Sequence, residues 1–229
     1  MEIGSLSSSG VYPFRLVDLL ALIALFILPF LVFRRLKKPT LPSVAIVGPS
    51  DSGKTSLLFF LRHKKLIQTA VSQCTNECEV NISGKGVKFV DAPGAIPHSF
   101  KQHVKQAKCV LLVLDSSDKK SIKIASDMLL DICSMKPASV CIVCNKTDVH
   151  SSRSAEDIQS IMELEIERIV EGRRSEMHLQ NHGGDDTYLM SLDMEGFGFH
   201  SLKCPVDIVR SSIKKGNVED VIEYVKRVI

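Results

Sequence analysis

Apolar positions recur along the chain with two different spacings, and these spacings predict its secondary structure. Short continuous apolar runs predict buried strands at 44–47, 79–82, 87–90, 110–114, 140–144 and 206–209. Apolar residues at helical spacing predict helices at 54–63, 119–135, 155–173 and 217–228. Gly84 to Gly86 predicts the turn of a hairpin. Residues 174–205 follow neither spacing, and we interpret them as an extended insertion before the last strand.

The order of these elements predicts an α/β fold. Strands that alternate with helices favour a mostly parallel sheet with helices on both faces, here with one antiparallel edge strand. Ligands of such sheets bind at the carboxyl ends of the strands. We therefore expect one domain over 43–229, with its functional residues directly after the predicted strands.

A separate apolar stretch, 16–33, predicts a transmembrane helix. Its 18 residues are apolar apart from Asp18. At about 1.5 Å per residue they span roughly 27 Å, which suits the thinner bilayer of the endoplasmic reticulum. The basic cluster at 34–38 follows, and a cleaved signal peptide lacks such a flank. The positive-inside rule predicts a short luminal N-terminus at 1–15 and a cytosolic juxtamembrane linker at 34–42.

The segment Gly48 to Thr55 reads G-P-S-D-S-G-K-T directly after the first predicted strand, and it predicts a phosphate-binding loop for a nucleoside triphosphate. Glycines let consecutive backbone N–H groups turn toward phosphate oxygens. Lys54 can place its charge on the outer phosphates, and the Thr55 hydroxyl can ligate Mg²⁺ at a helix N-terminus. The candidate phosphate-site residues are Gly48, Ser50, Asp51, Ser52, Gly53, Lys54, Thr55 and Ser56.

The tetrad N-K-T-D, which follows the predicted strand 140–144, predicts selection of guanine. Guanine presents an N1–H and a 2-amino group side by side, and the Asp148 carboxylate can accept from both. Adenine offers neither donor, so a buried carboxylate would be left unpaired. We expect Asn145 to link this loop to the phosphate loop and the Lys146 stem to lie along the purine face. The expected ligand is therefore GTP with Mg²⁺.

A third motif, Asp91-Ala92-Pro93-Gly94, follows the predicted strand 87–90. Asp91 is placed to hold Mg²⁺ through water, and the Gly94 amide to meet the γ-phosphate. The hydroxyl of Thr75 could complete the Mg²⁺ shell, with Thr69 as the alternative. The predicted metal site thus comprises Thr55, Thr75 and Asp91.

The order of these motifs over 43–229 resembles that of the Ras and Arf superfamily of small GTPases. Ser212, Ile213 and Lys214 resemble its S-A-K loop, whose backbone contacts guanine O6, with isoleucine in place of alanine. The N-terminal span, the D-x-P-G motif and Gly-Phe-Gly-Phe at 196–199 make nearly the whole chain similar to the beta-subunit family of the signal recognition particle receptor.

That resemblance implies a membrane-anchored, GTP-binding subunit that forms a heterodimer with the receptor's alpha subunit and recruits it to the endoplasmic reticulum for cotranslational protein targeting. Two alternatives stay open: a constitutive membrane tether with structural GTP, and an Arf-like GTPase of vesicle traffic. The built-in span disfavours the second, because Arf-like proteins usually bind membranes reversibly. Ala95 lies where Ras-type enzymes carry the water-orienting glutamine, so we expect slow intrinsic hydrolysis.

Charge and cysteine content narrow the function classes further. Of 29 basic and 26 acidic side chains, residues 1–38 hold five and two, which leaves 24 of each sign in the cytosolic part. That balance argues against direct nucleic-acid binding. The seven cysteines are an odd number and lie mostly in apolar strands, which favours a reducing compartment. Cys141 and Cys144 should point to opposite faces of their strand, an arrangement unsuited to a metal.

Overall fold

The computed structural model describes residues 25, 27, 41–66, 75–93, 100–180 and 187–229. Leu41–Ile229 forms a compact unit of its own. The predicted span at 16–33 lies outside the described residues except for Leu25 and Ile27, which are helical and exposed. Within the described part of the chain, no helix has both the length and the hydrophobicity needed to cross a membrane.

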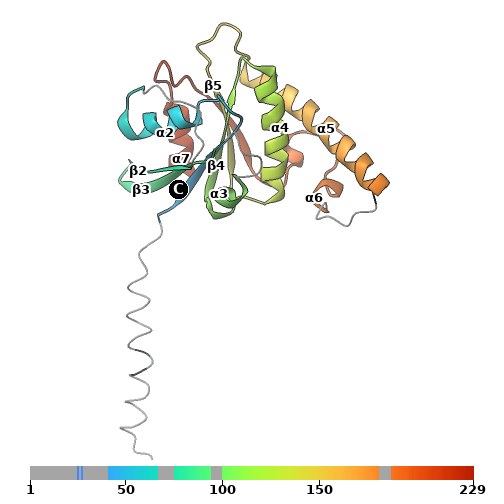
Figure 1. Ribbon diagram of the computed structural model, residues 1–229, viewed down its shortest axis with the longest axis horizontal. Coiled ribbons are helices and arrows are strands. Elements are labelled where there is room, and N and C mark those ends of the chain that lie inside the picture. The colour runs from blue at the N-terminus through green and yellow to red at the C-terminus, as the bar shows by residue number, and fades with distance from the viewer. Residues whose placement is uncertain (1–24, 26, 28–40, 67–74, 94–99, 181–186) are drawn as a thin grey trace, which may run out of the picture. The chain divides into compact units, whose positions relative to one another are not determined.

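A six-stranded sheet forms the centre of the compact unit (Figure 1). Its strand order is β2-β3-β1-β4-β5-β6. β2 pairs antiparallel with β3, and all other neighbours pair parallel. The prediction of a mostly parallel sheet with one antiparallel edge strand is confirmed. The strands are β1 (Ser43–Val47), β2 (Asn76–Ile82), β3 (Lys85–Asp91), β4 (Cys109–Asp115), β5 (Val140–Asn145) and β6 (Val206–Arg210).

Helices cover both faces of the sheet (Figure 1). One face packs against α2 (Lys54–His63) and α7 (Glu219–Val228). The other face packs against α3 (Phe100–Gln106), α4 (Lys119–Ser134), α5 (Ala155–Gln180) and α6 (Thr187–Met190). Central strands are therefore buried on both sides, which is why they read as continuous apolar runs.

The cysteines that the structure describes lie in these two cores. Cys141 belongs to the core under α2 and α7, whereas Cys144 belongs to the core under α4 and α5. The prediction that they point to opposite faces is confirmed. All six cysteines that the structure describes are buried free thiols.

Three helical segments differ from the prediction, and one of them is α6, which forms inside the segment interpreted as an extended insertion. α3 was not predicted, because only Phe100 and Val104 of this short helix are buried and one such pair makes no visible periodicity. The interpretation of 174–205 as an extended insertion is wrong at its start, because α5 continues to Gln180. Val170 is the last buried apolar side chain of α5 among those over 155–176 whose burial the structure describes, and polar contacts follow it.

Two arginines make those contacts. Arg173 Nη2 donates to Asp127 Oδ1 at 2.6 Å and Arg173 Nη1 to Asp131 Oδ1 at 3.1 Å, both on α4. Arg174 donates to the backbone carbonyls of Leu189 and Leu192, at 3.1 and 2.8 Å. Through these contacts α5 holds the segment that precedes β6. Four side chains of that segment are buried in the core on this face of the sheet: Leu192, Phe197, Phe199 and Leu202.

Candidate nucleotide-binding site

The phosphate loop joins β1 to α2 at the carboxyl end of the parallel strands, as predicted. Gly48 and Gly53 adopt φ angles of 146° and 98°, which favour glycine. A Cβ at Gly48 would clash with the carbonyl oxygen of Val113, and one at Gly53 would clash with Nδ2 of Asn145. Both glycines are therefore required by close approach as well as by backbone conformation. Ser50 and Asp51 are exposed in this loop.

Lys54 reaches back across the loop. Its Nζ donates to the carbonyl oxygen of Pro49 at 2.6 Å, and Ser52 Oγ donates to the same oxygen at 2.9 Å. Burial lowers the pKa of the Lys54 ammonium, while the charges of Asp91 and Asp51 raise it. The ammonium group is thus withdrawn from solvent within the loop, where an anion would compensate the cost of its burial.

Asp91 and Thr55 form a pair that fits a hard cation. Thr55 Oγ1 donates to Asp91 Oδ2 at 2.7 Å, and Asn76 Nδ2 donates to the same oxygen at 3.4 Å. Asp91 is fully buried, and its Oδ1 has no hydrogen-bond partner among the described residues. Burial raises the pKa of the Asp91 carboxyl, against the hydrogen bonds from Thr55 and Asn76 and the charge of Lys54. A buried carboxylate oxygen without a partner, beside a hydroxyl, suits Mg²⁺ and its bound water.

Asn145 connects three loops through one side chain. Its Nδ2 donates to the carbonyl oxygen of Ser52 at 2.8 Å, which is the predicted link to the phosphate loop. Its Oδ1 accepts from the backbone N–H of Ile213 at 3.3 Å, in the loop after β6. The side chain of Ile213 is buried in the core under α2 and α7. The loops after β1, β5 and β6 are therefore held at fixed spacing.

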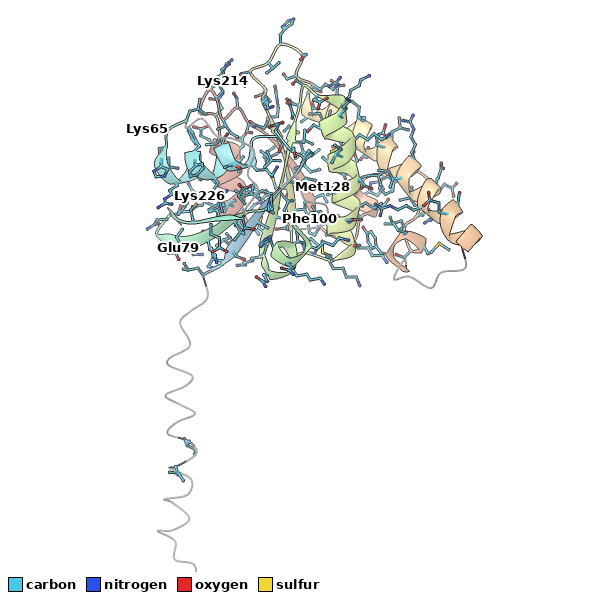
Figure 2. The ribbon with its side chains drawn as sticks, in the orientation of Figure 1. Lys65, Glu79, Phe100, Met128, Lys214 and Lys226 are labelled. Carbon is cyan, nitrogen blue, oxygen red and sulfur yellow. The ribbon has the colours of Figure 1, made fainter. Side chains whose placement is uncertain are left out.

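The carboxylate of Asp148 is held by the loop after β6. Ser212 Oγ donates to Asp148 Oδ1 at 2.7 Å, and this bond is the main reason why the pKa of Asp148 is lowered. Lys214 Nζ lies 3.9 Å from Asp148 Oδ2 and projects at the upper edge of the view in Figure 2. Sequence reasoning expected the Ser212 backbone to meet the base. The structure adds a second role, since the Ser212 side chain orients Asp148 and its hydrogen bond stabilises the carboxylate form.

Lys146 has a partner that sequence reasoning missed. Its φ is 62°, and its Nζ lies 2.7 Å from Asp115 Oδ2 at the end of β4. Burial raises the pKa of Asp115, but the hydrogen bonds from Lys146 and Ser117 outweigh burial and leave this pKa lowered. Asp115 could have been found, because it directly follows the predicted strand 110–114 at the same edge of the sheet.

Thr75 does not join the Asp91 pair in this structure. It is exposed, and its Oγ1 lies 3.4 Å from Nε2 of His103 on α3. The neighbouring residue Asn76, which the sequence did not single out, contacts Asp91 instead. A metal-binding role for Thr75 stays a prediction. Thr69, Gly94 and Ala95 lie outside the described residues, and Ser56 is half-buried in the first turn of α2.

Comparisons with known proteins agree with this geometry. The family model for the signal recognition particle receptor beta subunit matches residues 39–206. The signal recognition particle receptor subunit beta of Saccharomyces cerevisiae is 29% identical over 203 residues, which cover 80% of this chain and 83% of the yeast protein. The structure of the mammalian SRP receptor aligns at 23% identity and a TM-score of 0.68, over 82% of this chain and 100% of that chain.

Two structures from Chaetomium thermophilum also align. They are the SRb-GTP/SRX complex and SRb-GDP-Mg, and each has a TM-score of 0.63 and 20% identity. Each alignment covers 84% of this chain and 100% of that chain. The chain therefore shares the fold of these solved proteins.

Replacing Gly53 with alanine should weaken both folding and nucleotide binding. Gly84→Ala is the matched control, because Gly84 has a similar φ of 84° but a Cβ there would meet no described atom within 4 Å. Both variants should lose about 1–2 kcal/mol of unfolding free energy through backbone strain. Gly53→Ala should lose about 1–3 kcal/mol more, because Asn145 must leave its partners. Urea unfolding and titration with a fluorescent GTP analogue would measure this, and equal effects of both variants on GTP affinity would contradict it.

Replacing Asp91 with asparagine should separate stability from metal binding. Burial holds the folded-state pKa of Asp91 above the unfolded value of about 4, so without Mg²⁺ the folded state keeps this proton to higher pH. Its stabilising contribution is present below about pH 4 and is lost as pH rises through the folded-state pKa. In the presence of a chelator, Asp91→Asn should abolish this decrease in unfolding free energy with rising pH. The same variant should weaken Mg²⁺-dependent nucleotide binding by about 10–100-fold.

Unfolding as a function of pH in chelator, and nucleotide affinity as a function of Mg²⁺ concentration, would measure the two effects. Asp157→Asn, which changes an exposed carboxylate of α5, should alter neither. A variant with unchanged Mg²⁺ dependence would rule out Asp91 as a metal-site residue.

Proposed function

Because the chain belongs to the signal recognition particle receptor beta subunit family, we propose that it is the GTP-binding subunit that recruits the receptor's alpha subunit to the endoplasmic reticulum membrane. The observation that carries this proposal is the Asn145 bridge, which assembles the phosphate loop and the base-binding loops at one edge of the sheet. A phosphate cradle and an ionised Asp148 in register suit a guanine nucleotide.

The residues of the site divide the work of binding. The phosphate-loop amides and Lys54 hold the phosphates, and Thr55 with Asp91 would hold Mg²⁺. When bound, Mg²⁺ would neutralise charge on the outer phosphates. Asp148 accepts from the guanine edge, while Lys146, held by Asp115, lies against the base. The Chaetomium protein of the same fold carries GTP in one structure and GDP with Mg²⁺ in another, which supports these ligands.

Recruitment of a partner would use the segments next to the γ-phosphate. Asp91 ends β3, and the chain leads from it through 94–99 into α3. On the other side, Thr75 leads into β2 and contacts His103 of α3. A nucleotide that binds two arrangements of these segments unequally shifts the surface that they present to a partner. That surface would be continuous over the start of β2 and α3.

Anchoring in the membrane rests on the sequence. The apolar stretch 16–33 and the basic cluster 34–38 support a single span with its C-terminal side in the cytosol. The two alternatives, a constitutive tether with structural GTP and an Arf-like GTPase of vesicle traffic, share the same nucleotide site. Partner capture distinguishes the three functions.

A 39–229 fragment loaded with GTP should capture the receptor's alpha subunit from solubilised microsomes, and the GDP- and ATP-treated samples should capture much less. The reason is that the segments around Asp91 and Thr75 would differ between the GTP and GDP states. Mass spectrometry of the bound proteins measures this. Equal capture with GTP and GDP would favour the constitutive tether, and capture of vesicle-traffic proteins alone would contradict the proposed function.

Asp148→Asn should exchange guanine for xanthine specificity. Xanthine carries a 2-oxo group where guanine has its amino group, so a carboxamide donor fits it and a carboxylate does not. We expect GTP affinity to fall by about 10²–10³-fold, since a charged hydrogen-bond pair is worth about 3–4 kcal/mol in discrimination. XTP should bind in its place. Competition titrations measure both affinities, with Asp157→Asn as a control; retained GTP preference would exclude Asp148 as the base-selecting residue.

A further inference from the structure

The loops at the amino ends of the strands, opposite the nucleotide site, gather exposed lysines. Lys85 begins β3 after the hairpin turn, and Lys105 lies in the last turn of α3. Lys108 lies between α3 and β4, and Lys136 lies between α4 and β5. Lys226 lies in the last turn of α7. We call these five lysines the basic face. All five are exposed.

Hydrogen bonds bring these segments together around the start of β1. Ser43 Oγ donates to the carbonyl oxygen of Gln106 at 2.8 Å, and the Lys108 backbone N–H donates to that of Ser43 at 2.8 Å. Lys85 Nζ and Lys108 Nζ both donate to the backbone oxygen of Ile229, at 3.4 and 3.2 Å. In Figure 2, Lys226 of the basic face lies below Lys214 of the nucleotide site.

The positive charge of the basic face is balanced only in part. Lys85 and Lys108 contact the terminal oxygen of Ile229, and Lys226 lines a surface cavity together with Asp207, Asp220 and Glu223.

Lys105 and Lys136 have no ion-pair partner among the acidic side chains that the structure describes. The segments 83–85, 105–108, 134–139 and 226–229 contain no Asp or Glu. The nearby Glu77 of β2 ion-pairs with Lys88 at 2.7 Å, and Glu79 faces Lys88 in the strand register. Since residues 39–229 hold 24 charges of each sign, the surplus of positive charge at this edge is offset elsewhere.

The chemistry of the basic face fits a diffuse anionic surface. Lysine ammonium groups on flexible stems suit a field of phosphates better than a single bidentate ligand, for which arginine is preferred. The four segments 83–85, 105–108, 134–139 and 226–229 contain no aromatic residue on which a nucleic-acid base could stack. Four residues, 39–42, separate the basic cluster at 34–38 from β1, and they reach at most about 14 Å. A membrane span at 16–33 would thus keep the start of β1 close to lipid headgroups.

We propose that the basic face docks on anionic phospholipid headgroups and turns the nucleotide site away from the bilayer. This inference rests on the membrane anchoring of the proposed function. Docking would be electrostatic and would act only within the short distance over which an anionic leaflet attracts basic side chains. The affinity of the domain for the membrane surface would therefore fall as the salt concentration rises.

The test uses the full chain in nanodiscs of phosphatidylcholine alone or of phosphatidylcholine mixed with phosphatidylserine. Hydrogen exchange followed by mass spectrometry should find segments 83–85, 105–108 and 134–139 protected only in the anionic discs and only at low salt. Lys105→Glu with Lys136→Glu should lower the ratio of docked to free domain by at least about tenfold, since each basic side chain near the surface contributes about fivefold. Lys119→Glu with Lys120→Glu, exposed lysines at the opposite edge, should leave this ratio unchanged.

Three results would overturn the inference. Equal exchange in both kinds of disc, with the chain retained by the discs, would exclude lipid docking and leave the anchoring intact. Failure of the chain to co-purify with either disc would contradict the anchoring itself, and docking with it. Stronger protection of the same segments by added RNA in neutral discs than by phosphatidylserine would identify the face as a nucleic-acid surface.

Discussion

The carboxamide of Asn145 is the interaction on which the nucleotide site depends. It donates to the phosphate loop and accepts from the loop after β6, so the parts that hold phosphate and base share one buried support. The carbonyl of Ser52 and the amide of Ile213 are buried, so water would not replace Asn145 as their partner. Leaving a buried polar group without a hydrogen-bond partner costs more free energy than forming the bond contributes. Gly53 lies so close to the same side chain that a larger residue at this position would displace Asn145. The phosphate loop and the base loop cannot move independently of each other.

The parallel sheet gives the two ends of the domain different chemistry. At the carboxyl ends of the strands, Asp91, Asp115 and Asp148 are each held by a neighbouring donor and are arranged to meet a cation or a base. At the amino ends, exposed lysines gather, and two of them, Lys105 and Lys136, form no ion pair with an acidic side chain that the structure describes. Antiparallel strands would mix the two kinds of loop at each edge. The topology therefore allows one end to bind a nucleotide while the other responds to a charged surface.

The fold and much of the site could be predicted because their signals are local in the sequence. The runs in β1, β4 and β5 are apolar throughout, and the phosphate loop and the N-K-T-D tetrad follow two of them directly. The sequence alone could not show which side chains from distant parts of the chain contact one another. Asn76 has no motif of its own, yet it lies beside Asp91 because β2 returns antiparallel to β3. The end of α5 escaped prediction for the same reason, since Arg173 and Arg174 hold it through partners on α4 and after α6.

Ile213 lies where the small-GTPase loop that this segment resembles carries alanine. Its amide donates to Asn145, while its side chain is buried with the residues of α2 and α7. Because the contact with Asn145 is made by the backbone amide, the side chain at this position is constrained mainly by packing in the core. We expect the isoleucine to change how the core under α2 and α7 is filled and to leave the backbone hydrogen bond to Asn145 in place.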